Sequence, residues 1–554
     1  MEEKLKIPLG IDDFKVVSKQ CYYVDKTLMI KDVLSMPEES VVLFTRPRRF
    51  GKSLAISMLS TFFDEKNPNS KQYFEGKRIA MEKEFALCGS YPVIALGFKD
   101  IRSKTFEDLQ NDVMRAIRDE FLRHDELLLS DKTSAEDKAY LGQIKDGWLE
   151  EESYPESLLR LCRMLHAHHG KKPYLFIDEY DTPIQAGYEN GYYDEAIPFF
   201  RALYGKALKG NQFLQTAVLT GVLRIAKESP FSGINNLVVD NGFDSAFNEY
   251  FGFSYGEAKE LVAYFGADHS LEELWKWYGG YWFGGVEVIN PWSILSYFRF
   301  KRSLKEYWTN TSSVSILSSL LSDPRFSYSG LIGDLLAGKR VKAKPNLTVS
   351  YADLSGNVGQ FLGFLIAAGY LSYLPETGES FVPNLEASIA LQDEILSRYG
   401  LDESQVALSE FKQAIKAGDG EAFASLLRKV LLHSFSYFDF NQERSYQAMV
   451  LTLVSILFED CFVKSEVLTG EGRCDILVQP KSAHGFGAVL EIKHVKGKTS
   501  QQRLEERAES ALRQIGEKGY VEDLFLVKAK PIVAYGIAFC QKRVVIKSQL
   551  IKEA

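Results

Sequence analysis

An apolar segment that runs directly into Gly51-Lys52-Ser53 constrains the fold of this chain more than any other feature. Residues 41–45 read Val-Val-Leu-Phe-Thr, as in a buried strand, and the Leu-Ala-Ile after Ser53 begins an apolar helix. At such a strand-to-helix turn the backbone N–H groups and the helix dipole favour a bound phosphate. Lys52 can reach the β- and γ-phosphates, and the Ser53 hydroxyl can hold Mg²⁺. The segment therefore predicts a nucleoside triphosphate site.

One position departs from the general loop pattern. In G-x-x-x-x-G-K-[ST] the first glycine would stand at position 46, where this chain has Arg46. A short Gly-Lys-Ser sequence also occurs in ordinary loops, so a structural turn is the alternative. The strand before the loop and the helix after it favour nucleotide binding. We expect this loop to bind ATP through Arg46, Arg49, Gly51, Lys52 and Ser53.

A second apolar run ends in carboxylates. Residues 173–181 read Pro-Tyr-Leu-Phe-Ile-Asp-Glu-Tyr-Asp, the pattern of a buried parallel strand that delivers acids to the carboxyl edge of a sheet. Asp178 would hold Mg²⁺ opposite Ser53, and Glu179 would polarise the attacking water. The alternative is a strand capped by solvated carboxylates. The chemical match with the loop favours the ATPase interpretation.

A third run, residues 213–221, ends in Thr220 and Gly221. In ATPases with an extra strand between the loop strand and the acidic strand, a polar residue at this place senses the γ-phosphate. We predict that role for Thr220, and we predict that Arg224 faces transition-state charge, either within one chain or across the interface of a homo-oligomer. A strand terminus with a solvated arginine is the alternative.

Four segments make the chain resemble the bacterial AAA-ATPase-like family. They are YYVDKT at 22–27, TRPRRFGKS at 45–53, FIDEYD at 176–181 and LTGVLRIAKES at 219–229. In this family the Arg-Pro-Arg-Arg-Phe form of the loop is usual, so Arg46 departs from the general pattern but not from the family. The resemblance covers most of the chain. It also implies a PD-(D/E)XK nuclease-like domain at the C-terminus, which members commonly carry.

The C-terminal residues support that implication by their own chemistry. Asp475 lies in the apolar run 472–478, and Glu491 and Lys493 lie in the apolar run 487–493. Alternation along a strand puts Glu491 and Lys493 on one face. If a hairpin brings Asp475 alongside, the two carboxylates can share Mg²⁺ or Mn²⁺ while Lys493 positions water or stabilises charge on phosphate. A solvated strand edge is the alternative, but unpaired charge in apolar strands is costly.

The flanking segments predict the order helix, three strands, helix, strand. Residues 445–453 form an apolar helix, and residues 500–520 form a charged amphipathic helix that brings Gln514 near the site. Glu443 is the best-placed additional acid, with Glu459 as the alternative. Several basic residues suit a nucleic-acid backbone, unless they only form ion pairs on a solvated helix face. They are Lys493, Lys496, Lys498, Arg503, Arg507 and Arg513.

The middle of the chain is mostly helical by its periodicity. Residues 275–293 indicate a helix end, a glycine-rich turn, a hairpin and another helix, whose aromatic residues we expect to pack on the ATPase core rather than to stack bases. Residues 358–384 indicate a helix followed by a hairpin, a winged-helix pattern that we interpret as a relay. We divide the chain into an AAA-like ATPase domain (1–232), a helical lid (233–345), a winged-helix-like relay (346–434) and a nuclease-like domain (435–554).

Composition excludes several classes of protein. The formal net charge of −8 argues against a general nucleic-acid coat protein. No run of about 20 apolar residues and no signal-peptide core is present, so we expect no membrane span and a cytoplasmic location. The six cysteines lack C-x-x-C spacing and predict free thiols.

These observations predict an α/β multidomain protein with a parallel P-loop sheet, a helical and winged-helix middle, and a restriction-endonuclease-like C-terminal domain. The expected function is Mg²⁺-dependent ATP hydrolysis coupled to metal-dependent cleavage of DNA or RNA, in defence against mobile DNA or in repair. The alternative is a nucleotide-switched scaffold whose C-terminal domain binds nucleic acid or protein without cleavage.

Overall fold

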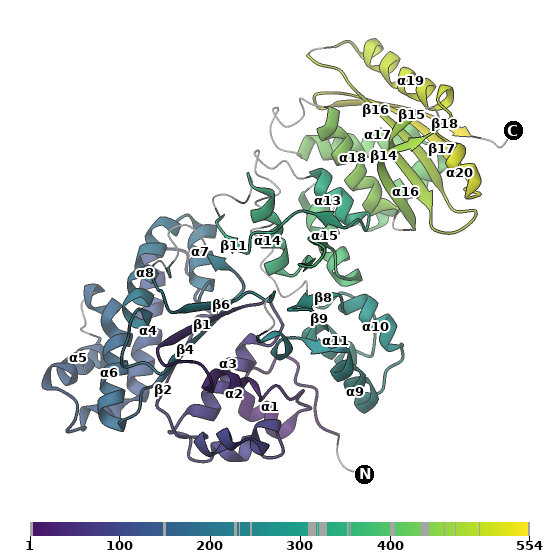
Figure 1. The fold of residues 1–554 in the computed structure, drawn as a ribbon. Helices are drawn as coiled ribbons and strands as arrows, with labels where there is room; N and C mark the ends of the chain where they lie inside the picture. The colour runs from purple at the N-terminus through teal and green to yellow at the C-terminus, as the bar shows by residue number, and fades with distance from the viewer. Residues whose placement is uncertain are drawn as a thin grey trace.

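The computed structural model describes most of the 554 residues, and the regions between the described ranges receive no structural account. The described residues are 4–147, 151–225, 230–231, 233–243, 246–308, 317, 320, 329–351, 354, 356–398, 405–433, 443–458, 460–470, 472–497 and 499–551. The N-terminal sheet and the C-terminal sheet lie at opposite ends of the molecule, with the middle of the chain between them (Figure 1).

The N-terminal part is built on a five-stranded parallel sheet in the order β2-β3-β4-β1-β6. Its strands are β1 (Ser40–Thr45), β2 (Val93–Gly97), β3 (Tyr174–Asp178), β4 (Thr216–Gly221) and β6 (Leu237–Asp240). The extra strand expected between the loop strand and the acidic strand is therefore confirmed as β4. Because all five strands are parallel, the segments that follow them meet at one edge.

Helices cover both faces of this sheet because the side chains of each strand alternate. On β1, Val42 and Phe44 pack in the cluster that contains α3, whereas Val41 and Leu43 pack with α4, α6 and α8. The helices are α1 (Phe14–Gln20), α2 (Met29–Leu34), α3 (Lys52–Phe63), α4 (Phe106–Arg123), α5 (Ala135–Asp146), α6 (Ser157–His169), α7 (Thr182–Asn190) and α8 (Tyr193–Leu208). Short 3₁₀ turns are η1 (Ser70–Tyr73), η2 (Arg78–Met81), η3 (Lys83–Leu87), η4 (Asp125–Leu128), η5 (Glu151–Glu156) and η6 (Asn248–Tyr250).

The helix end, glycine-rich turn, hairpin and helix predicted over residues 275–293 are confirmed. They correspond to α10 (Leu271–Tyr278), β8 (Tyr281–Phe283), β9 (Val286–Ile289) and α11 (Pro291–Arg299). Before them in the chain come β7 (Phe253–Ser254), which pairs with β9, and α9 (Tyr255–Phe265). The hairpin packs on the loop of the N-terminal part, with Phe50 in edge contact with Tyr281 and Phe283 at centroid distances of 5.0 and 5.2 Å. The expected packing of these rings on the core is therefore present.

The next segment contains the predicted helix and hairpin as α14 (Val358–Ala368), β12 (Ser372–Leu374) and β13 (Glu379–Phe381). Around them lie β10 (Val341–Lys342), which pairs with β13, and the helices α13 (Ser329–Leu336), α15 (Leu385–Arg398), α16 (Gln405–Ala417) and α17 (Gly420–His433). The segment joins the N-terminal part through β11 (Thr348–Val349), which pairs in parallel with β5 (Arg224–Ile225).

A buried carboxyl group links α15 to α11. Glu386 accepts hydrogen bonds from the Ser293 hydroxyl at 2.6 Å and from the backbone N–H groups of Tyr307 and Trp308 at 2.5 and 3.1 Å. Burial raises the pKa of Glu386 to about 7, although these hydrogen bonds oppose the shift. The link between the two segments therefore contains a group that titrates close to neutral pH.

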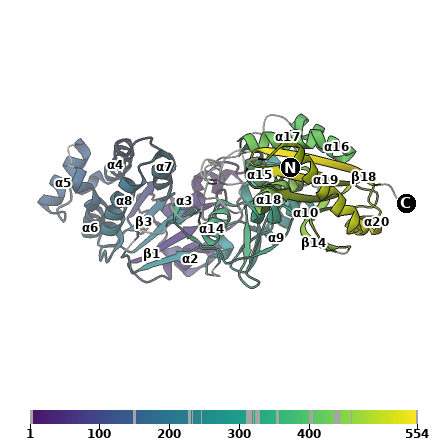
Figure 2. The same cartoon turned by 90° about the horizontal axis from the view of Figure 1, so that it is seen from above.

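The C-terminal sheet has the order β14-β15-β16-β17-β18, and β16 and β17 are its parallel pair. The elements are α18 (Glu443–Leu457), β14 (Cys461–Thr469), β15 (Gly472–Pro480), β16 (Gly487–His494), α19 (Gln501–Glu517), α20 (Glu522–Leu526), β17 (Ile532–Cys540) and β18 (Arg543–Ile551). The predicted order of helix, three strands, helix and strand is confirmed, with α20 and β18 in addition. Helix α19 packs on β17 (Figure 2). The two elements are so close that a Cβ added to Gly536 of β17 would lie 2.1 Å from the carbonyl oxygen of Ala508 in α19.

Two expectations from composition can be compared with the structure. All six cysteines are buried and free, which confirms the prediction of unpaired thiols. Among the helices in the described ranges, none has the length and apolar character needed to cross a bilayer.

Candidate functional site

The loop between β1 and α3 closes around the Lys52 side chain. Gly51 stands at the N-cap of α3 with φ = 90°, a left-handed conformation that favours glycine. The Lys52 amine donates hydrogen bonds to the carbonyl oxygens of Arg46 at 3.0 Å and Pro47 at 2.9 Å. Burial lowers the pKa of Lys52 to about 8, and the nearby carboxylates partly oppose this shift. The lysine is thus a buried cation held by backbone dipoles at the start of a helix.

The structure brings Asp178 together with Ser53 and Thr220. The Thr220 hydroxyl donates to Asp178 Oδ1 at 2.5 Å, across neighbouring strands β4 and β3. Burial raises the pKa of Asp178, while hydrogen bonds with Ser53 and Thr220 act in the opposite direction. Two hydroxyls and one carboxylate therefore share the carboxyl edge of the sheet next to Lys52. Oxygen ligands of this type suit Mg²⁺.

Glu179 follows β3 directly and has φ = 54°, which is uncommon outside glycine. Its backbone N–H donates to Thr220 Oγ1 at 3.3 Å, and its Oε2 accepts a hydrogen bond from the Thr182 hydroxyl at 3.0 Å. The carboxylate also lines the cavity described next. Two neighbouring threonines therefore hold both its backbone and its side chain.

A cavity of about 270 Å³ lies between the loop, the N-terminal segment 8–12 and the segment that contains α11. One part of its wall is apolar and aromatic, and the other part carries charged groups. The apolar residues include Leu9, Ile11, Tyr22, Phe253, Trp292 and Leu295, and the charged residues are Asp12, Lys26, Arg48, Arg49, Lys52, Lys99, Arg102 and Glu179. The excess of positive charge suits a polyanion, and the apolar wall suits a planar base.

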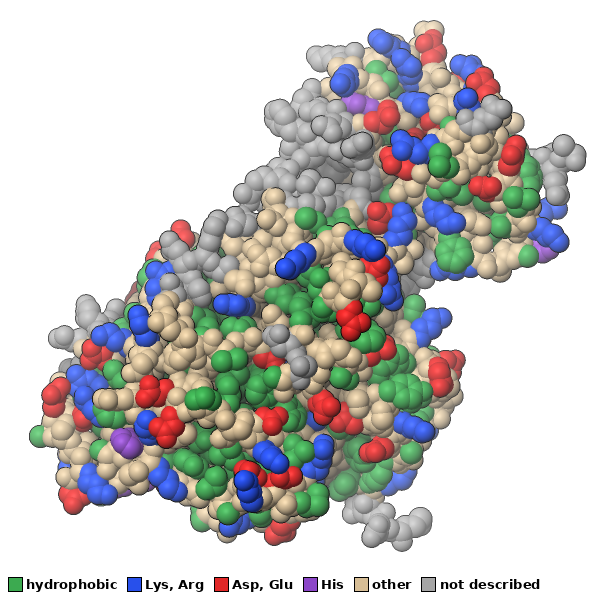
Figure 3. Space-filling model, in the orientation of Figure 1, with side chains coloured by type: hydrophobic (Ala, Val, Ile, Leu, Met, Phe, Trp, Pro, Cys, Tyr) green, Lys and Arg blue, Asp and Glu red, His purple; other side chains and the backbone are tan. Residues whose placement is uncertain are grey.

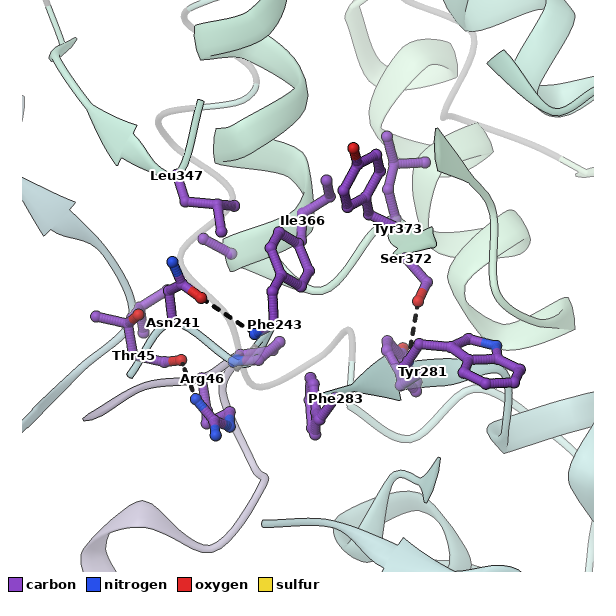
Figure 4. Close-up of a pocket in the computed structure, with 15 residues that line it drawn as sticks. Thr45, Arg46, Asn241, Phe243, Tyr281, Phe283, Leu347, Ile366, Ser372 and Tyr373 are labelled. Atoms are coloured by element: carbon purple, nitrogen blue, oxygen red, sulfur yellow. Dashed lines mark hydrogen bonds between the residues drawn. The ribbon is translucent and has the colours of Figure 1, made fainter. Parts of the chain in front are cut away.

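Arg46, which we expected from the sequence to bind the nucleotide, lies outside the cavity. Its side chain is 0% exposed and points away from the cavity to Asp240, at 2.8 Å, with that carboxylate 3% exposed. The guanidinium also donates to the carbonyl oxygens of Thr45 and Asp240 and lies over the rings of Phe251 and Phe283. Figure 4 shows this residue beside Phe283, next to a small cavity of about 20 Å³. Arg46 therefore anchors the loop to β6 and the β8–β9 hairpin.

Arg49 and Arg224 occupy different surroundings. Arg49 lines the cavity, and its guanidinium lies 4.0 Å from the ring centroid of Trp292 on α11. Arg224 belongs to β5, where its backbone pairs with Thr348, and it is absent from the described residues that line the cavity. The structure therefore brings Arg49 to the candidate site but does not bring Arg224 there within one chain.

The second candidate site lies at the centre of the C-terminal sheet. Ile476 pairs with Leu490, so Asp475 and Glu491 occupy facing positions one step along the β15–β16 ladder. The Ile492 N–H donates to Asp475 Oδ2 at 2.7 Å. Glu491 Oε1 accepts from the Lys493 amine at 2.8 Å and from the Gln514 amide at 2.6 Å. The expected neighbours are thus close together.

The electrostatics of this site fit a bound cation. Burial raises the pKa of Asp475 to about 7, with a further contribution from the charge of Glu491. Glu491 is 3% exposed, and within the described part of the chain its Oε2 atom has no hydrogen-bond partner. Two close carboxylates with one unsatisfied oxygen are a suitable pair of ligands. A set of three acidic, histidine or cysteine ligands is not found among the residues that the structure describes.

The additional acid expected on the first helix is at the edge of this site. Glu443 is exposed, its Oε2 accepts a hydrogen bond from the His494 N–H at 3.0 Å, and its charge contributes to the raised pKa of Asp475. From the same helix, Gln447 donates to the Asp475 carbonyl oxygen at 3.2 Å. Glu459 and Lys498, also considered from the sequence, lie outside the described residues.

Each of the two candidate sites lies in a part of the chain that matches a known protein family. Residues 8–231 match the family described as "Predicted AAA-ATPase", and residues 441–549 match the PD-(D/E)XK nuclease superfamily. The chain has an AAA-ATPase-like domain and a C-terminal PD-(D/E)XK nuclease superfamily domain. It is also 25% identical over 548 residues to an uncharacterized protein in the vnfD 5' region of Azotobacter chroococcum mcd 1. That alignment covers 96% of each chain, so the similarity extends along both domains.

In the AAA-ATPase-like domain, sequence reasoning missed one positioning residue. Asp181 is 4% exposed, and its Oδ2 accepts hydrogen bonds from the N–H groups of Val222 and Leu223 at 2.9 and 2.8 Å. A Cβ at Gly221 would lie 2.6 Å from Asp181 Oδ1. Asp181 therefore fixes the turn after Thr220. The sequence feature that could have identified Asp181 is its place in the acidic run, two residues after Glu179.

Proposed function

We propose that the AAA-ATPase-like domain binds and hydrolyses ATP with Mg²⁺, and that the nuclease superfamily domain cleaves phosphodiester bonds in DNA or RNA with Mg²⁺ or Mn²⁺. The observation that carries the proposal is the convergence of Lys52, Ser53, Asp178, Glu179 and Thr220 on one sheet edge beside one cavity. We keep the boundaries 1–232, 233–345, 346–434 and 435–554 for the ATPase, lid, winged-helix-like and nuclease parts. Defence against mobile DNA and repair are both compatible roles.

Each ATPase residue has a defined task in this proposal. Lys52 leaves the loop carbonyl oxygens and binds the β- and γ-phosphates. Ser53 and Asp178 hold Mg²⁺, which neutralises phosphate charge. Glu179 orients the attacking water and accepts its proton, and Thr220 contacts the γ-phosphate while it holds Asp178 in place. Gly51 leaves space for the phosphates, because apart from neighbouring residues of the chain no heavy atom lies within 4 Å of a Cβ built there.

The nuclease proposal depends on Asp475, Glu491 and Lys493. The two carboxylates hold the divalent ion, which lowers the pKa of water and neutralises phosphate charge. Lys493 stabilises the charge that develops on the phosphate. Exposed Lys496, Arg503, Arg507 and Arg513 follow the site in sequence and could contact the nucleic-acid backbone. Basic and acidic side chains are interspersed on the face of this domain shown in Figure 3, so this face carries no broad patch of a single charge.

Nucleotide binding and turnover provide the first test. Calorimetry should show that Lys52→Ala loses Mg·ATP binding, because it removes the cation from the loop. Glu179→Gln should bind Mg·ATP but release no phosphate, since the amide cannot accept the proton of water. Lys104→Ala, which changes an exposed lysine outside the cavity, is the matched control. Unchanged ATP affinity in Lys52→Ala would contradict the loop assignment.

Cleavage of labelled DNA and RNA with Mg²⁺ or Mn²⁺ provides the second test. Asp475→Ala and Lys493→Ala should each abolish cleavage and keep ATP hydrolysis and the melting temperature near those of the wild type. Glu517→Ala, which removes an exposed carboxylate at the end of α19, is the control and should cleave normally. Chelation of divalent metal should abolish wild-type cleavage. Cleavage that survives both substitutions would exclude this site.

One observation favours the second candidate function, a nucleotide-switched scaffold without cleavage. The Lys493 amine lies 2.8 Å from Glu491 and already neutralises one of the two acids, and a third ligand is not found in the described ranges. Under this alternative, the wild-type protein would bind nucleic acid in an ATP-dependent manner but leave it intact with either metal. The cleavage assay distinguishes the two functions.

A further inference from the structure

Sheet order places a lysine that belongs to none of the sequence motifs beside the proposed catalytic glutamate. Strand β2 pairs with β3 so that Gly97 is the partner of Asp178, and the Phe98 N–H donates to the Asp178 carbonyl oxygen at 3.0 Å. Glu179 comes one position after Asp178, and Lys99 comes two positions after Gly97. Both residues therefore leave the same edge of the sheet on adjacent strands.

The Lys99 side chain belongs to the wall of the 270 Å³ cavity, together with Lys52 and Glu179. Its amine lies 3.0 Å from Asp12 Oδ2 on the N-terminal segment, with side-chain exposures of 53% and 57%. The hydrogen bond with Asp12 raises the pKa of Lys99, and the charge of Glu179 contributes in the same direction. An ion pair this exposed is weak, so a phosphate group can replace Asp12 as the partner of the lysine.

ATP hydrolysis in P-loop proteins needs a cation where negative charge develops on the transferred phosphoryl group. Arg224, the residue that the sequence suggested for this task, does not line the cavity of its own chain in the described structure. Lys99 lines that cavity together with Glu179, the group that would accept the proton of water. A residue of the same chain can therefore supply the charge.

We propose that Lys99 contacts the γ-phosphate of ATP and stabilises the transition state of hydrolysis within one chain; this role rests on the ATPase function proposed above. The oxygen of water forms a bond to the γ-phosphorus while the bond from that phosphorus to the β–γ bridging oxygen breaks. Glu179 accepts the proton of water, and ADP and phosphate are the products. Lys99 keeps its protons and supplies only positive charge. Asp12 holds the lysine until a phosphate group replaces it.

Lys99→Ala, Lys99→Arg and Lys104→Ala test this role. Lys104 is an exposed lysine five positions downstream that does not line the cavity. Calorimetry should give a Kd for Mg·ATP in Lys99→Ala close to that of the wild type, whereas kcat for phosphate release should fall about 100-fold. Lys99→Arg should recover part of the loss, and Lys104→Ala should match the wild type. Wild-type kcat should not depend on protein concentration, because the lysine acts in its own chain.

Asp12→Asn gives a readout that a purely structural lysine would not affect. Without the carboxylate, Lys99 is free to meet phosphate, so the Kd for Mg·ATP should decrease. The same substitution made in Lys99→Ala protein should not change the Kd, and the difference between the two backgrounds measures the coupling. Equal effects of Asp12→Asn in both backgrounds would overturn the proposed exchange of partners.

The remaining outcomes separate this role from the ATPase function itself. Wild-type turnover in Lys99→Ala overturns the role alone. Recovery of turnover when Lys99→Ala protein is mixed with Glu179→Gln protein would show that the lysine acts in a neighbouring chain, which overturns action within one chain. A wild-type protein that binds no Mg·ATP refutes the ATPase function, and this role with it.

Discussion

Replacing Arg46 by Met should destabilise the N-terminal domain rather than remove a nucleotide ligand. The Arg46 guanidinium is 2.8 Å from Asp240, and the two side chains are 0% and 3% exposed. Removing one partner of such a pair leaves an uncompensated buried charge, at a cost of about 3–5 kcal/mol. For a domain of roughly 150–250 residues, each kcal/mol lowers the melting temperature by about 2–4 °C. Arg46→Met should therefore lower the transition of this domain by roughly 6–20 °C.

Differential scanning calorimetry of the full chain measures this effect, provided that the transition of the N-terminal domain is resolved from that of the C-terminal domain. The double variant Arg46→Met/Asp240→Leu removes both charges and should recover most of the lost stability. Arg49→Ala is the matched control, because this arginine lies in the cavity against Trp292 and should affect ATP affinity more than stability. An Arg46→Met protein with wild-type melting temperature and weakened ATP binding would refute the anchoring role.

Two further predictions concern Arg224 and the effect of pH on stability. Arg224→Ala should keep turnover close to that of the wild type, because Arg224 does not line the cavity of its own chain; loss of turnover that is restored by mixing with Glu179→Gln protein would instead place Arg224 in a homo-oligomeric site. Burial raises the folded-state pKa of Glu386 from 4.5 to about 7. Between these two pH values the folded state binds more protons than the unfolded state, so the stability of the protein should fall as pH rises from about 4.5 to about 7. Melting curves of Glu386→Gln should be flatter over the same pH range, and a wild-type curve without this fall would contradict the buried-acid argument.

The parts of both sites that could be predicted from the sequence are those with a local pattern. Apolar runs that end in Gly-Lys-Ser or Asp-Glu predict buried strands that lead to one edge, and the structure has them as β1 and β3. In the C-terminal domain, alternation along β16 places Glu491 and Lys493 on one face. The Lys493 amine is 2.8 Å from Glu491. Both patterns depend on neighbours a few positions apart along the chain.

The parts that could not be predicted depend on pairing between distant segments. Arg46 and Arg49 are the same residue type in one loop, but only Arg46 meets Asp240, 194 positions away on β6. Lys99 follows a strand that carries no motif, and only the order of the strands puts it beside Glu179. The pairing of distant strands therefore decides that Arg46 anchors the loop and that Lys99 faces the cavity. Composition alone does not reveal either role.

The loop that holds Lys52 also contacts the middle of the chain. Pro47, whose carbonyl oxygen accepts from the Lys52 amine at 2.9 Å, lies against the end of α14, where a Cβ at Gly369 would be 3.3 Å from Pro47 Cβ. The Tyr281 hydroxyl donates to the Gly369 carbonyl oxygen at 3.1 Å and joins the same point to the β8–β9 hairpin. If ATP draws Lys52 to its phosphates, Arg46 and Pro47 lose a donor to their carbonyl oxygens. The contacts of Pro47 with α14 and of Tyr281 with Gly369 are the links of the described structure that join these carbonyl groups to the middle of the chain, and packed interfaces of this kind transmit small shifts because they are close-packed.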